Sequence, residues 1–204
     1  MEQLEKLKDV WKSQSESTIK FTKSDIYNMV HKRSSSIVKW ILIISILEFA
    51  LPNLFMFFTN FESTKEVYQN YGLNNIMLFY AITHILFILG FIYIFYTNYK
   101  NINAERSVKS LLHNILKTRN TVKYYIYYNL TMASIIGIHV FYIVFNSELF
   151  TEKLPANTSM IMIWFIAIGT FAFFLFLFWV FYRIVYGFFL KKLKNNYTEL
   201  QRNE

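Results

Sequence analysis

The sequence predicts an all-α integral membrane protein, a four-helix bundle whose helices cross the bilayer up, down, up and down. Four long apolar runs occupy residues 37–59, 75–96, 124–145 and 160–190. Each run has at least the roughly 20 residues that a helix needs to cross a bilayer. The Lys and Arg content also alternates sharply between the segments that join the runs. Together these two patterns predict four membrane spans with a defined orientation.

The basic residues lie almost entirely on one side of the predicted membrane. Of the 21 Lys and Arg residues, 19 fall in residues 1–39, 97–123 and 183–204, and two fall in residues 60–74 and 146–159. Short loops rich in Lys and Arg stay in the cytoplasm, so both termini and the segment 97–123 are expected there. Abundant Phe, Tyr, Ile, Asn and Lys favour a bacterial source. We therefore expect a multi-pass protein of the bacterial inner membrane.

The chain divides into a cytosolic leader (1–36), a transmembrane domain (37–190, with the cytosolic loop 97–123) and a cytosolic basic tail (191–204). A chain of 204 residues leaves no room for a separate soluble domain of ordinary size. The net charge of +8 is explained by the Lys and Arg residues that keep short segments in the cytoplasm. The same residues attract anionic lipid headgroups. We expect no direct binding of nucleic acid.

The leader has the pattern of two short amphipathic helices. Leu4, Leu7 and Trp11 recur at helical spacing among charged residues. Thr22 and Asp25 then match a capping box, with Phe21 and Ile26 placed as its hydrophobic staple. The helix that begins there is expected to run into the first span. A candidate partner-binding face follows from the apolar positions of both helices: Leu4, Leu7, Trp11, Ile26, Met29 and Val30.

The cytosolic loop 97–123 contains a second amphipathic stripe. Its apolar face is formed by Val108, Leu111, Leu112, Ile115 and Leu116, and basic residues flank it. A stripe of this kind lies on the lipid interface, packs on another helix of the same chain, or binds a partner. The sequence leaves these three alternatives open.

Glu48 is the most unusual residue of the spans, because it is the acidic residue placed deep inside one of them. A charge at the bilayer centre costs at least about 2.5 kcal/mol, so Glu48 should be protonated, paired or facing a wet cavity. Counting residues along the helices places His84 at a similar depth, so contact between the side chains of Glu48 and His84 is expected. The predicted intramembrane polar locus also includes Pro52, which removes a backbone hydrogen bond to the Glu48 carbonyl, and Ser134 and Thr170.

Two interpretations of this locus remain open. It is either a proton or cation site, or an interhelical hydrogen bond that fixes how the first two helices pair, worth about 0.6 kcal/mol on average in membranes. Ala133 and Gly137 match a small-xxx-small packing pattern, and homo-oligomerisation stays open. No motif for catalysis, metal binding or cofactor binding is present, and cysteine is absent. We expect no catalytic residue, no metal site and no cofactor.

The first 50 residues resemble an uncharacterised family of small four-span membrane proteins of flavobacteria and their relatives. The likeness rests on Leu4, Leu7 and Trp11 and on the stretches SDIYNM (24–29), KRSSSIVKWI (32–41) and ILEF (46–49). Members of that family often carry the label beta-carotene 15,15'-monooxygenase, and some are encoded near sigma factors. The resemblance thus implies either a carotenoid-modifying membrane enzyme or an anti-sigma-like role.

Three functions follow as hypotheses. The first is a non-enzymatic inner-membrane protein with a regulatory or interaction role, whose cytosolic leader binds a protein partner. The second is a small transporter or proton relay that uses Glu48 and His84. The third, from the resemblance, is a carotenoid-modifying enzyme.

Overall fold

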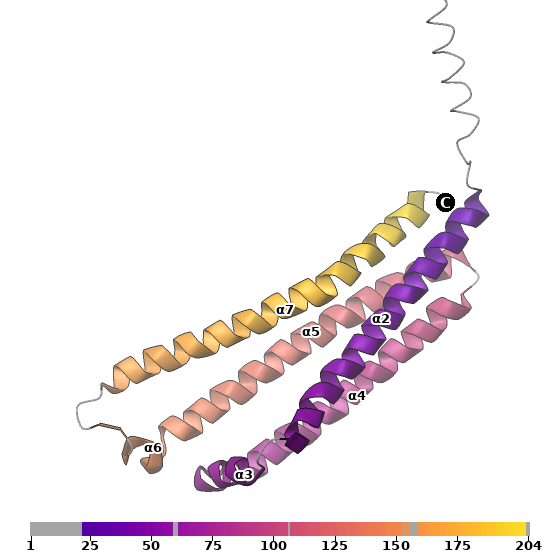
Figure 1. Cartoon of the computed structure of the whole chain (residues 1–204). Coiled ribbons are helices and arrows are strands. Elements are labelled where there is room, and N and C mark those ends of the chain that lie inside the picture. The colour runs from indigo at the N-terminus through magenta and orange to yellow at the C-terminus, as the bar shows by residue number, and fades with distance from the viewer. Residues whose placement is uncertain (1–21, 59–60, 106, 153, 156–158, 203–204) are drawn as a thin grey trace, which may run out of the picture.

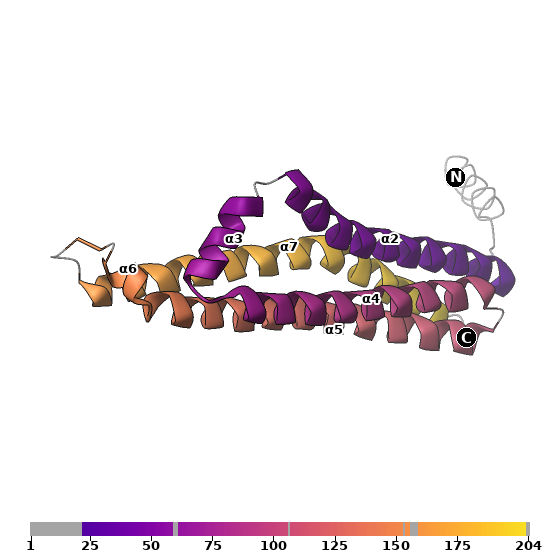
Figure 2. The ribbon, with the colours of Figure 1, turned by 90° about the horizontal axis from the view of Figure 1, so that it is seen from below.

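The chain folds into helices throughout the part that the structure, a computed structural model, describes: residues 22–58, 61–105, 107–152, 154–155 and 159–202. No strand occurs in these segments. Four long helices lie side by side, and two short ones lie toward one end of the molecule (Figures 1 and 2). The long helices are α2 (Lys23–Phe58), α4 (Asn74–Ala104), α5 (Val108–Phe145) and α7 (Met160–Arg202), and the short ones are α3 (Phe61–Asn70) and α6 (Glu148–Glu152).

The prediction of an all-helical chain with four candidate membrane spans is confirmed, because all four long helices are long and apolar enough to cross a membrane. The helices also extend beyond the apolar runs. α2 begins at Lys23, α5 begins at Val108 and α7 continues to Arg202. Residues 97–123, predicted as a loop, therefore consist mostly of the last turns of α4 and the first turns of α5. The basic segments are continuous with the spans.

The start of α2 has the predicted capping box. The Thr22 amide donates to Asp25 Oδ2 over 2.9 Å, and the Asp25 amide donates to Thr22 Oγ1 over 3.1 Å. These reciprocal bonds satisfy two backbone donors that a helix start leaves unpaired. α2 then continues without a break into the first apolar run, as predicted. The Phe21 half of the staple and the predicted helix at Leu4, Leu7 and Trp11 lie outside the described residues.

One end of the bundle, which we call the basic end, is formed by three segments. They are the first turns of α2, the α4–α5 connection and the last turns of α7. His31 Nε2 donates to the carbonyl of Ile102 over 2.7 Å, and the Tyr27 hydroxyl donates to the carbonyl of Glu105 over 3.0 Å. On the other side of α2, Asn196 Nδ2 donates to Ser34 Oγ over 2.9 Å. α2 is therefore tied to both α4 and α7 at this end.

The core follows a coiled-coil-like spacing. Ile88, Phe95 and Ile102 are buried in α4 at intervals of seven residues, and Tyr186, Leu193 and Leu200 repeat this interval in α7. Buried residues of α2 and α5 recur at steps of three or four: Val30, Ser34, Ile37, Ile41 and Ser45 in α2, and Leu111, Ile115, Thr118, Val122 and Tyr125 in α5. A seam with this spacing keeps long helices in contact along their length. The stripe predicted at Leu111, Leu112 and Ile115 thus packs within the chain.

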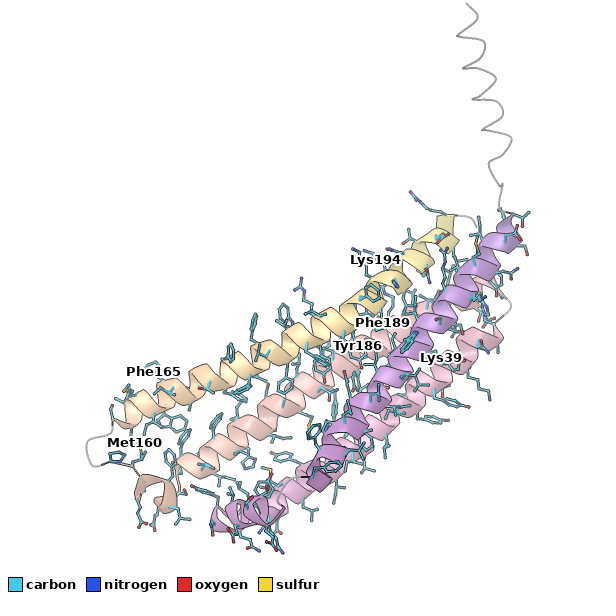
Figure 3. The ribbon with its side chains drawn as sticks, viewed as in Figure 1. Lys39, Met160, Phe165, Tyr186, Phe189 and Lys194 are labelled. Atoms are coloured by element: carbon cyan, nitrogen blue, oxygen red, sulfur yellow. The ribbon has the colours of Figure 1, made fainter. Side chains whose placement is uncertain are left out.

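The half of the bundle at α3 and α6, the far end, is packed more loosely. Among the described residues, the buried side chains apart from Leu73 lie between the basic end and about the middle of each long helix. The most apolar stretches of α5 and α7 contain no buried residue. In Figure 3, Met160 and Phe165 of α7 lie at the far end, and Lys194 lies at the basic end. The exposed apolar surface is the kind of surface that faces lipid tails.

The α4–α5 connection is short and internally bonded. Glu105 Oε1 accepts a hydrogen bond from the Ser107 amide over 3.3 Å, and Glu105 Oε2 accepts from Ser110 Oγ over 2.6 Å and from Asn114 Nδ2 over 3.3 Å. A carboxylate at this position also interacts favourably with the positive end of the α5 dipole. The turn holds α4 against α5 at the basic end.

Gly137 lets α5 and α7 approach each other closely. A Cβ atom at this position would overlap the ring of Phe171 on α7. This residue belongs to the small-xxx-small pair predicted from the sequence. Its partner Ala133 lies one turn away and lines a pocket between the helices. The pattern therefore marks a contact between helices of one chain.

Candidate functional site

Glu48 continues the inward-facing stripe of α2, three residues after the buried Ser45. Its Oε2 atom accepts a hydrogen bond from the Tyr125 hydroxyl over 2.5 Å and a second from the Tyr186 hydroxyl over 3.1 Å. Tyr125 belongs to α5 and Tyr186 to α7, so this one carboxyl group joins three helices. We call Glu48, Tyr125, Tyr186 and the neighbouring Tyr182 the tyrosine cluster.

The tyrosine cluster sits in an aromatic shell. The Tyr125 ring has centroid distances of 5.4 to 6.3 Å to Phe91, Phe95, Tyr182 and Tyr186. All four rings meet it at steep angles, which is the favourable edge-to-face arrangement. Tyr125 and Tyr186 are buried, at 1% and 0% exposure. The shell packs around the two phenolic donors to Glu48.

The second carboxyl oxygen of Glu48, Oε1, differs from the first in its hydrogen bonding. Glu48 Oε1 is buried and has no hydrogen-bond partner. No basic side chain of the described residues forms an ion pair with Glu48. A buried carboxyl group without a cation is costly to keep charged. The arrangement therefore suits a group that holds a proton, with Tyr125 and Tyr186 orienting it.

His84 lies elsewhere, and the predicted contact between Glu48 and His84 is absent. The His84 ring stacks on Tyr128 of α5 at a centroid distance of 5.9 Å, and its Nδ1 atom is buried without a partner. Counting residues gave the height of each residue along its helix but not the direction of its side chain. Each residue turns the helix by about 100°, and on α4 this rotation points His84 at α5.

His84 instead lines an apolar pocket of about 580 Å³ between α4, α5 and α7, with α3 at one edge. Asn129 and Tyr182 are among the polar residues that line it. Tyr80 also lines the pocket, and its hydroxyl forms a hydrogen bond of 2.7 Å with His139 Nδ1. Tyr182 is shared with the tyrosine cluster, so the pocket adjoins the polar centre without containing Glu48.

The remaining members of the predicted polar locus do not join it. Pro52 lies inside α2 with an exposed side chain, one turn beyond Glu48. Ser134 Oγ donates to the carbonyl of Leu130 on its own helix over 2.8 Å. Thr170 is exposed on α7. Glu48 therefore lies at the centre of a polar cluster, but its hydrogen-bond partners are Tyr125 and Tyr186 and not the predicted residues.

The candidate partner-binding face is divided by the fold. Val30 is fully buried, and Ile26 is half-buried against the core. Both residues pack inside the bundle because the apolar stripe of α2 continues into its core. Met29 is half-buried at the edge of a groove between α2 and α7. Leu4, Leu7 and Trp11 lie outside the described residues.

Sequence reasoning missed Tyr125, Tyr182 and Tyr186. All three sit near span ends, where tyrosine commonly lies in the headgroup layer. The signal that could have found them is their spacing. Tyr186 precedes Leu193 and Leu200 by multiples of seven, and Tyr125 follows Val122 and Thr118 at steps of three and four. Among the described residues, no group of three or more His, Asp or Glu side chains could hold a metal ion.

A family described as a domain of unknown function (DUF8845) matches residues 24–204. The chain belongs to this family. The DUF8845 match begins at the first turn of α2 and includes every helix described above, so the tyrosine cluster and the basic end are parts of the family domain. No curated protein and no solved structure matches the chain.

Proposed function

We propose that this DUF8845 protein is a non-enzymatic regulatory or interaction protein of the bacterial inner membrane, whose leader binds a cytosolic protein. In this proposal the four long helices cross the bilayer up, down, up and down, with both termini in the cytoplasm. The charge distribution supports the orientation, since 19 of the 21 basic residues fall in residues 1–39, 97–123 and 183–204.

The observation that carries the proposal is the anchoring of α2 at the basic end. The last part of the leader forms the first turns of α2, which are hydrogen-bonded to α4 through Tyr27 and His31 and to α7 through Ser34. Further along the same helix, Glu48 belongs to the tyrosine cluster. A partner held by the leader would therefore act on a helix that contacts every other long helix, which suits a regulatory role.

The test is in-cell photocrosslinking from the leader of the full-length protein. A photoreactive amino acid at position 7 should capture a discrete protein, and that protein, once purified, should bind the wild-type chain. Binding should be lost in the triple variant Leu4→Glu, Leu7→Glu and Trp11→Glu. It should persist in the control Glu5→Gln and Lys12→Gln, which alters only the polar face. Crosslinks to lipid alone, or equal binding by both variants, would refute the proposal.

A second candidate, a proton relay centred on Glu48, is favoured by the buried carboxyl group and its two phenolic donors. Purified protein in liposomes should then admit protons along an imposed potential, as reported by an enclosed pH-sensitive dye. Glu48→Gln should abolish the flux because an amide cannot exchange the proton. Glu148→Gln on the exposed α6 should leave it intact. Absence of flux in the wild type, or flux that Glu48→Gln preserves, would eliminate this candidate.

A further inference from the structure

A groove between α2 and α7 at the basic end is lined by three cationic side chains. Lys32 and Arg33 project from α2 and Lys192 from α7, around a space of about 750 Å³. One carboxylate, Glu199, shares the groove, and Arg33 Nη1 lies 3.7 Å from its Oε2 atom. The groove therefore carries a formal excess of two positive charges.

The floor of this groove is built by the packing of the two helices. Asn196 is 6% exposed and bonded to Ser34, and Ile37 is 8% exposed. Ser36 lines the α2 side with a small side chain, which leaves room between the helices. Asn195 adds an amide on the opposite wall. Cations and neutral hydrogen-bonding groups around a concave space are the chemistry that binds a phosphate group.

The position of the groove along the helices points to a lipid as the source of that phosphate. The apolar runs are predicted to end at 37 on α2 and at 190 on α7, so Ser36 and Lys192 lie at the boundary. Lys32 and Arg33 lie about 6–8 Å beyond it, at 1.5 Å per residue. This distance matches the headgroup layer, which is about 5–8 Å thick on each side of the hydrocarbon core.

The surface below the groove suits acyl chains. One turn from Ser36 toward the apolar half, Trp40 is 53% exposed. One turn from Lys192 in the same direction, Phe188 is 56% exposed, and the Lys192 ammonium lies 4.1 Å from its ring centroid. Ile184, a further turn along α7, is 68% exposed. Because residues four apart share a helix face, the basic groove continues into an apolar one.

We propose that this groove is a binding site for one anionic phospholipid, with its phosphate between Lys32, Arg33 and Lys192 and its acyl chains along Trp40 and Phe188. Basic pockets between membrane helices on the cytoplasmic side bind anionic headgroups. The inference rests on the membrane placement given under the proposed function. It does not depend on the leader having a partner.

The test uses the full-length protein in detergent, titrated with phosphatidylglycerol and observed by native mass spectrometry. Removing two cations that each contribute about 1 kcal/mol should weaken binding roughly tenfold or more, so this is the effect expected of Lys32→Gln with Lys192→Gln. The control Lys109→Gln with Lys117→Gln removes the same charge from exposed sites of α5 at the same end and should change binding less than twofold. Ser36→Phe keeps every charge but fills the groove, and it should also weaken binding.

Three outcomes would overturn the proposal. Equal losses in the two double variants would show general electrostatic attraction. Undiminished binding by Ser36→Phe would place the lipid outside the groove. Binding of glycerol phosphate as tight as that of phosphatidylglycerol would identify a small-anion site. The titration is made in detergent, so it depends neither on the orientation of the protein in a membrane nor on a protein that binds the leader. Its result is therefore independent of the crosslinking experiment.

Discussion

Replacing Tyr125 with alanine is expected to lower the free energy of unfolding by about 3 kcal/mol, the cost typical of deleting a buried aromatic side chain. The substitution removes a fully buried ring that contacts four others, and it removes a donor to Glu48. The loss is measured by denaturant titration of the purified protein in detergent micelles.

Two further variants show where that loss arises. Tyr125→Phe keeps the ring and deletes the hydroxyl, so it should cost only about 0.6 kcal/mol, the average for a hydrogen bond between membrane helices. Tyr124→Ala removes the same kind of side chain from the preceding position, where it is 66% exposed. This substitution should cost less than about 0.5 kcal/mol. Similar losses for Tyr124→Ala and Tyr125→Ala would contradict the packing of the tyrosine cluster.

The helices and their apolar runs could be predicted because hydropathy and charge are patterns of consecutive residues and do not depend on how the helices pack. Continuous apolar stretches identify the candidate spans whatever their neighbours are. The capping box was predictable for the same reason, since Thr22 and Asp25 are three residues apart and bond locally. Glu48 was recognised as unusual because a carboxyl group in an apolar run is costly in any arrangement.

The partners of Glu48 could not be predicted because they depend on the rotation of three helices about their axes. Height along a helix pointed to His84, whereas rotation brings Tyr125 and Tyr186 to the carboxyl group. Tyrosines near the ends of apolar runs commonly lie at the membrane interface, and packing overrides that preference here. The three alternatives for residues 108–116 were likewise undecidable without the positions of α2, α4 and α7.

In the proposal above, the four long helices cross the membrane with the basic end in the cytoplasm, and single-cysteine labelling can test this orientation. The chain has no cysteine, so single cysteines can be introduced without a background. Four exposed hydroxyl residues suit the purpose: Ser63 on α3 and Thr151 on α6 at the far end, and Ser107 and Thr198 at the basic end. None of these substitutions changes the charge that sets orientation.

The deciding measurement is labelling of these four variants with a membrane-impermeant maleimide in intact spheroplasts. Ser63→Cys and Thr151→Cys are expected to react fully. Ser107→Cys and Thr198→Cys should react only after the membrane is permeabilised. Labelling of Ser107→Cys in intact spheroplasts would contradict a cytoplasmic basic end. Labelling of only one of Ser63→Cys and Thr151→Cys in intact spheroplasts would contradict the four crossings.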